Sequence, residues 1–83
     1  MTLDDLRGAK KRTVGTKQTV KALQKLKVRA VYVAGDAEDH ITREIVKASR
    51  EKGIELVHVE SMAALGKACG IEVGAATAAV LEE

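Results

Sequence analysis

The sequence predicts an α/β domain with helices on both faces of a small sheet. Segments of strand and helix character alternate along its 83 residues. Residues 29–36, RAVYVAGD, are almost continuously apolar until a glycine and an aspartate, as in a strand that is buried on both faces. No proline or low-complexity linker interrupts the chain, so we interpret residues 1–83 as one domain.

The N-terminal part predicts two helices with a short extended segment between them. Residues 3–10 predict a short helix with acids in its first turn, where the helix dipole favours negative charge. Residues 12–14 are extended and lead to a helix that ends near Leu26. We expect the side-chain oxygen of Thr16 to cap this helix by accepting a backbone N–H of its first turn. Its apolar face is predicted to contain Val20, Ala22, Leu23 and Leu26.

Five further elements are predicted in the rest of the chain. The run at residues 29–36 is the first strand, and an amphipathic helix over residues 39–53 ends at a glycine. A second strand covers residues 54–61, and Ser61 caps a helix over residues 62–70. Residues 73–81 are alanine-rich, but their threonine and valines favour a final strand. The residues of the third helix expected to point inward are Ile41, Ile45, Val46 and Ala48.

Positive charge is concentrated at the N-terminal end of the chain. Residues 1–29 carry nine Lys/Arg against two acids, a net charge of +7, whereas the remaining residues have a net charge of −5. Lys17, Lys21 and Lys25 recur every four residues, so they repel one another unless an anion lies beside them. This asymmetry favours a polyanionic partner, although a solvated basic face without a partner is the alternative.

The residues do not form a recognisable catalytic, nucleotide or metal site. Phosphate-binding loops have two glycines separated by four residues, whereas Gly8 and Gly15 are separated by six. The acids and the histidine of GDAEDH, residues 35–40, fit a polar turn and a helix start better than a metal site. His58 has no serine or cysteine at a spacing that would make the pair catalytic. Cys69 is expected to be a small buried apolar residue. We therefore expect a non-enzyme without a cofactor or metal.

The apolar runs are too short to span a membrane, which needs roughly 18 to 20 residues. The N-terminal residues also lack the apolar centre of a signal peptide. We therefore expect no membrane partner and a cytoplasmic location. The absence of an exposed apolar run favours a monomer.

The low aromatic content indicates which kind of nucleic acid the chain would bind. The chain has no Phe or Trp, and its one tyrosine, Tyr32, lies in the apolar run. The aromatic platforms that stack single-stranded bases are therefore missing. We expect a structured nucleic acid held by its phosphates, with Lys17 and Gln18 able to donate to base edges.

Two motifs resemble the L-seven-Ae ribosomal protein family. They are GTKQTVKAL (residues 15–23) and LGKACGIEVGAA (residues 65–76), with a buried strand ending in AGD between them. The similarity is greatest to the short bacterial YbxF-type branch and covers nearly the whole chain. It implies an L-thirty-e-like three-layer α/β/α sandwich with a small mixed sheet. It also implies binding to kink-turn RNA, a sharply bent internal loop with sheared G·A pairs, in ribosomal RNA or a riboswitch.

The resemblance also implies which residues contact RNA. The first segment contains Gly15, Thr16, Lys17, Gln18 and Lys21. Archaeal members carry asparagine and glutamate where this chain carries Lys17 and Gln18. The second segment contains Ile71, Glu72, Val73 and Gly74, whose aliphatic side chains would cover a flipped-out nucleotide.

Two alternatives accompany this assignment. Val73 also fits a core residue at the start of the last strand, and the whole chain also fits a protein-interaction module that docks on a ribonucleoprotein. Weaker contacts to the RNA backbone are expected from Lys10, Lys11, Arg12 and Lys25.

Overall fold

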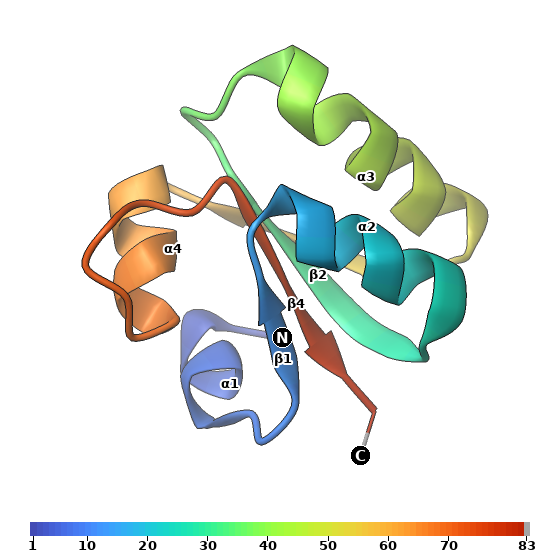
Figure 1. The fold of residues 1–83 in the computed structure, drawn as a ribbon, viewed down its shortest axis with the longest axis horizontal. Coiled ribbons are helices and arrows are strands. Elements are labelled where there is room, and N and C mark those ends of the chain that lie inside the picture. Colours follow the sequence, from blue (N-terminus) through green and yellow to red (C-terminus); the bar gives the residue numbers. More distant parts are fainter. Residues whose placement is uncertain (83) are drawn as a thin grey trace.

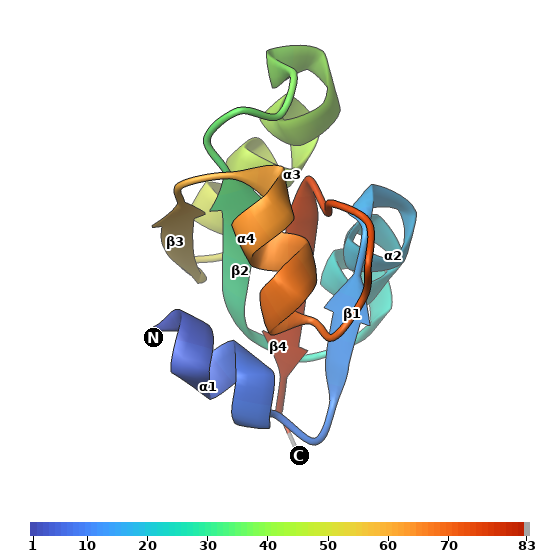
Figure 2. The ribbon, with the colours of Figure 1, turned by 90° about the vertical axis from the view of Figure 1, so that its left-hand side faces the viewer.

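The computed structural model describes residues 1–82 as three layers, with a sheet between two pairs of helices. Helices α1 and α4 cover one face of the sheet, and α2 and α3 cover the other (Figures 1 and 2). This arrangement confirms the predicted α/β/α sandwich. The elements are α1 (Leu3–Gly8), β1 (Arg12–Val14), α2 (Thr16–Lys25), β2 (Val28–Ala34), α3 (Asp39–Glu51), β3 (Glu55–Val59), α4 (Met62–Ala68) and β4 (Thr77–Leu81).

The sheet is mixed, and the last strand of the chain lies inside it. The strand order is β1-β4-β2-β3; β4 pairs antiparallel with both β1 and β2, while β2 and β3 are parallel. Thr77 to Val80 are all buried, and the small side chains of Ala78 and Ala79 leave room for helices on both faces. The strand prediction is correct for Thr77–Leu81, where pairing on two sides outweighs the helix propensity of alanine, but residues 73–76 precede the strand and are not part of it.

Strand β2 divides the hydrophobic core into two clusters. Its alternating side chains point to opposite faces of the sheet, as the period of a strand requires. Ala30 and Tyr32 pack in the cluster that also contains Leu6 and Leu65, from α1 and α4. Val31 and Val33 pack in the cluster beneath α2 and α3. The prediction that this strand is buried on both faces is confirmed.

Two apolar residues predicted to point inward are instead exposed. Leu26 is 55% exposed, because α2 ends at Lys25 and Leu26 continues in an extended conformation. Ile41, in the first turn of α3, is also exposed. Both helices bury polar residues in place of these apolar ones. In α3 the buried Ser49 hydroxyl has a hydrogen-bond partner, because its Oγ donates to the Ile45 carbonyl at 2.7 Å.

Local signals fix the other helix ends as expected. Gly53 has a φ of +68° just after α3. Ser61 Oγ accepts the Ala64 N–H at 3.1 Å and caps α4. Within residues 1–82, the helices are too short and too polar to cross a membrane.

Burial of Tyr32 raises the pKa of its hydroxyl to about 12, and the negative charges of Asp5 and Glu55 add to this shift. The hydroxyl donates to the Thr2 carbonyl at 2.6 Å. Between about pH 10 and pH 12 the unfolded chain has lost this proton while the folded protein keeps it. The free energy of unfolding should therefore fall as the pH rises through this range.

Urea unfolding of the parent protein and Tyr32→Phe checks this expectation. The variant should be less stable at neutral pH, since the Thr2 carbonyl keeps only the Leu6 N–H as a donor, but should lose less further stability in alkali. Lysine titration is common to both proteins and cancels in the comparison. The same alkaline loss in both would show that Tyr32 does not cause it.

Candidate nucleic-acid interface

Backbone hydrogen bonds bring three loops to one edge of the sheet. The Gly15 N–H donates to the Thr77 carbonyl at 2.9 Å, and the Ala34 N–H donates to the Ala76 carbonyl at 2.9 Å. The Gly35 N–H donates to the Val59 carbonyl at 2.7 Å. The start of α2 therefore lies beside the segment that leads into β4, although 55 or more residues separate them in sequence (Figure 1).

Helix α2 begins without a side-chain cap. Gly15 is the N-cap with a φ of +92°, a conformation that favours glycine, and Thr16 is the first helical residue. The predicted capping role of Thr16 is wrong, since no side-chain hydrogen bond caps this helix. A glycine N-cap without a side chain leaves the first-turn N–H groups accessible to an anionic ligand.

The outer face of α2 is polar and positively charged. Lys17, Gln18, Lys21 and Lys25 are exposed, and none of these lysines forms an ion pair within residues 1–82. The side chain of Gln18 is exposed, and its Oε1 accepts the Val14 N–H in a long contact of 3.5 Å. The structure thus places four of the predicted contact residues on one side of a single helix.

Two buried threonines hold α2 against the sheet, and the sequence did not predict them. Thr13 in β1 and Thr19 in α2 are buried, and their Oγ1 atoms lie 2.9 Å apart. The hydrogen bond joins the helix to the strand that precedes it. Threonine six residues from threonine is no recognisable motif, so only the tertiary structure reveals this pair.

The second predicted segment forms an exposed loop against α4. Gly70, with a φ of +77°, turns the chain out of the helix. The Ile71 N–H donates to the Gly66 carbonyl at 3.1 Å, and the Ala75 N–H donates to the Met62 carbonyl at 3.0 Å. The loop is therefore tied to α4 at both ends.

The aliphatic side chains of this loop face solvent. Val73 is 70% exposed and Ile71 is 36% exposed, while Glu72 and Gly74 are also exposed. The alternative that Val73 is a core residue is therefore wrong. Apolar side chains this exposed at a loop tip are available to a ligand.

The predicted backbone contacts differ in their surroundings. Lys10 and Lys11 are exposed. Arg12 is half-buried, and its guanidinium donates to three carbonyls: Nη1 to Leu6 at 3.1 Å and Arg7 at 3.2 Å, and Nη2 to Cys69 at 3.0 Å.

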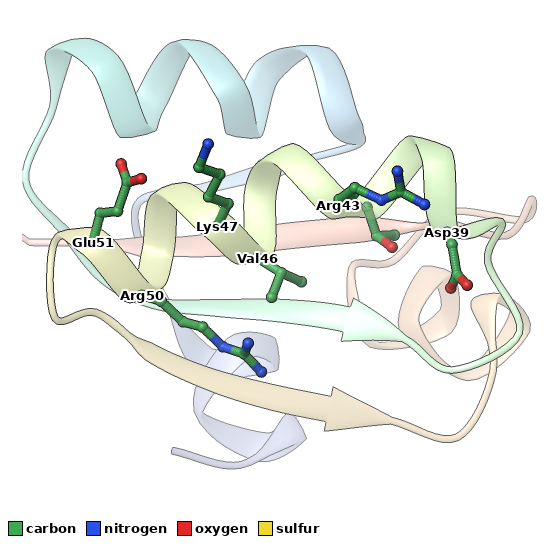
Figure 3. Close-up of a pocket in the computed structure, with 7 residues that line it drawn as sticks. Asp39, Arg43, Val46, Lys47, Arg50 and Glu51 are labelled. Atoms are coloured by element: carbon green, nitrogen blue, oxygen red, sulfur yellow. The ribbon is translucent and has the colours of Figure 1, made fainter.

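A shallow hollow on α3 lies apart from these segments. Three basic side chains line it, Arg43, Lys47 and Arg50, and the acids Asp39 and Glu51 lie toward its two ends (Figure 3). No group of three His, Cys, Asp or Glu residues among residues 1–82 is arranged to hold a metal. Cys69 is buried, as expected, and burial raises the pKa of its thiol.

Gly66 lets the loop approach α4, and this contact can be tested. A Cβ atom at position 66 would lie 2.1 Å from the Val73 carbonyl oxygen, so the backbone would have to move. Gly66→Ala should therefore destabilise the protein by about 1 to 3 kcal/mol, although alanine normally favours a helix.

Gly8→Ala is the matched control for this substitution. Gly8 also lies in a helix, but nothing is within 4 Å of its Cβ position. It should keep or slightly raise the unfolding temperature. A Gly66→Ala protein as stable as the Gly8→Ala protein would contradict the described contact.

Comparison with known proteins agrees with the two motifs and the fold. The Ribosomal protein L7Ae/L30e/S12e/Gadd45 family matches residues 2–83. "RNA-binding protein TTE2299" of Caldanaerobacter subterraneus is 55% identical over 69 residues, 83% of this chain and 84% of the relative. "RNA-binding protein YbxF" of Geobacillus stearothermophilus is 41% identical over 81 residues, 98% of this chain and 99% of the relative.

A solved structure shows the same architecture. The Giardia lamblia 15.5kD RNA binding protein superimposes with a TM-score of 0.85 at 25% identity, covering 98% of this chain and 71% of the other. Sequence and structure therefore agree that the chain belongs to the L7Ae/L30e/S12e/Gadd45 family, as the resemblance to its bacterial YbxF-type members predicted.

Proposed function

We propose that this chain is an RNA-binding protein that recognises kink-turn RNA. The observation that carries the proposal is the juxtaposition of an uncapped, lysine-bearing helix start with an exposed aliphatic loop. The Gly15–Thr77 hydrogen bond brings these two features to one edge. The printed names of the bacterial relatives support RNA as the ligand.

The first segment supplies polar and charged contacts. Backbone N–H groups after Gly15 and the side chain of Thr16 would bind phosphate oxygens. Lys17 and Lys21 add positive charge on the exposed face of the same helix turns. Gln18 is assigned to base readout, because the amide nitrogen of an exposed glutamine can donate to the O6 and N7 acceptors of guanine.

The second segment supplies an apolar surface. Ile71 and Val73 are exposed and can cover a nucleotide that the bend expels from the stack. A base on aliphatic side chains gains contact area without a stacking ring, which agrees with the single buried tyrosine of this chain. We propose that Glu72 and Gly74 contribute through their backbone, which carries the loop past the nucleotide.

Binding alone accounts for these features, so we propose that the protein is not an enzyme. We further propose that it acts in the cytoplasm as a monomer, on ribosomal RNA or a riboswitch. A protein-interaction module that docks on a ribonucleoprotein would use the same charged face but would not distinguish RNA structures.

An electrophoretic mobility shift with kink-turn RNA tests the proposal. The control is an RNA of the same length in which the G·A pairs are replaced by Watson–Crick pairs. We expect tighter binding to the kink-turn, and a log-log salt slope of roughly −0.7 to −0.9 per phosphate contact. Equal binding of both RNAs, or a flat salt response, would favour the protein-interaction alternative.

Substitutions on α2 separate base readout from charge. Gln18→Ala should weaken kink-turn binding by about tenfold while leaving the control RNA nearly unchanged, because a base contact contributes roughly 1 to 3 kcal/mol.

Lys25→Ala is the matched comparison, since Lys25 is exposed two turns further along the same helix. It should weaken the binding of both RNAs by a similar factor and reduce the salt slope by about the amount that one phosphate contact contributes. If Gln18→Ala lowered the affinity for both RNAs by a similar factor, Gln18 would not be a residue that reads the bases of the kink-turn.

A further inference from the structure

We infer that Arg12 is a positioning residue that couples the two segments of the proposed interface, instead of a direct contact to the RNA backbone. This inference rests on the proposed function. It replaces the role that the sequence suggested for Arg12, and it follows from where the guanidinium donates its hydrogen bonds.

Arg12 binds the C-terminal ends of two helices at once. Nη1 donates to the carbonyls of Leu6 and Arg7, in the last turn of α1, and Nη2 donates to the Cys69 carbonyl just after α4. Terminal helix carbonyls lack partners within their own helix and carry partial negative charge. The Leu6 carbonyl also accepts the Ala9 N–H at 3.2 Å, and one cation adds hydrogen bonds at both helix ends.

The bond to Cys69 fixes the start of the second segment. Gly70 follows Cys69 directly and lies close enough for its Cβ position to be 3.8 Å from Arg12 Nη2. The loop that carries Ile71 and Val73 leaves α4 at this point. Loss of the Nη2 contact would leave this end of the loop held only by backbone hydrogen bonds to α4, such as Ile71–Gly66, and therefore less firmly positioned.

The backbone of Arg12 fixes the first segment. Arg12 begins β1, where it pairs with Val80, and β1 leads within three residues to Gly15. A single residue thus connects the strand that positions α2 with the helix end that positions the exposed loop. The fork geometry of arginine is needed, because an ammonium group cannot hold carbonyls on two separate helices equally well.

Arg12→Lys tests this role, because it keeps the charge but removes the fork. We expect kink-turn affinity to fall by about tenfold, the cost of losing charge-assisted hydrogen bonds that order the loop. The salt slope should be unchanged, because the charge is conserved. Lys11→Gln, on the exposed neighbour, should instead weaken kink-turn and control RNA alike and reduce the salt slope.

A double-mutant cycle shows whether Arg12 acts through the loop. Val73→Ser removes the exposed aliphatic contact without touching the core. In the Val73→Ser protein, Arg12→Lys should lower kink-turn affinity by less than about twofold, because the loop no longer contributes its apolar contact. Full additivity of the two substitutions, or a parent-like affinity of Arg12→Lys, would overturn the inference.

Amide NMR spectra of the free proteins make the result independent of RNA binding. Arg12→Lys should shift the resonances of residues 70–74 and leave those of α3 unchanged. Unchanged loop resonances would overturn the positioning role even if the RNA assays succeed. Failure of the parent protein to distinguish kink-turn from control RNA would instead count against the proposed function, while shifted loop resonances would still support the coupling.

Discussion

The hydrogen bond from the Gly15 N–H to the Thr77 carbonyl is the contact on which the candidate interface depends. It joins the start of α2 to the start of the central strand β4, and the Ala34–Ala76 bond joins the end of β2 to the residue before β4. Both bonds use only backbone atoms. The two segments can therefore change their outward side chains without losing their relative position, which suits a surface that must match a particular ligand.

The interior and the functional edge of this domain are built in different ways. Apolar side chains on both faces of β2 form the interior and supply most of the free energy of folding. The edge instead relies on backbone contacts at glycine, such as the approach of Val73 to Gly66, and on the guanidinium of Arg12. Exposed residues at the edge contribute little to folding, so they remain available for binding.

Features with a local cause were predictable from the sequence. The buried run of β2, the serine cap of α4 and the glycine after α3 each depend on neighbouring residues, and each lies where the sequence placed it. The segment at β4 was ambiguous by propensity, and pairing with two strands resolves it. The motifs also predicted a lysine-bearing outer face for α2, and its exposure agrees.

Features with a tertiary cause were not predictable. Thr16 seemed the natural cap, but the positive φ of Gly15 places the cap one residue earlier. Leu26 follows the apolar spacing of α2 but lies beyond the end of the helix. Arg12 resembled the lysines beside it, because no local pattern shows that its side chain reaches the ends of α1 and α4.

The central claim is that two distant segments form one RNA-binding surface, and NMR mapping of a kink-turn titration tests it most directly. Amide and methyl resonances should shift for residues 15–21 and for residues 71–74 with the same dissociation constant, while β3 and the outer side of α3 stay unchanged. Shifts confined to one segment, or centred on the charged hollow of α3, would contradict the account.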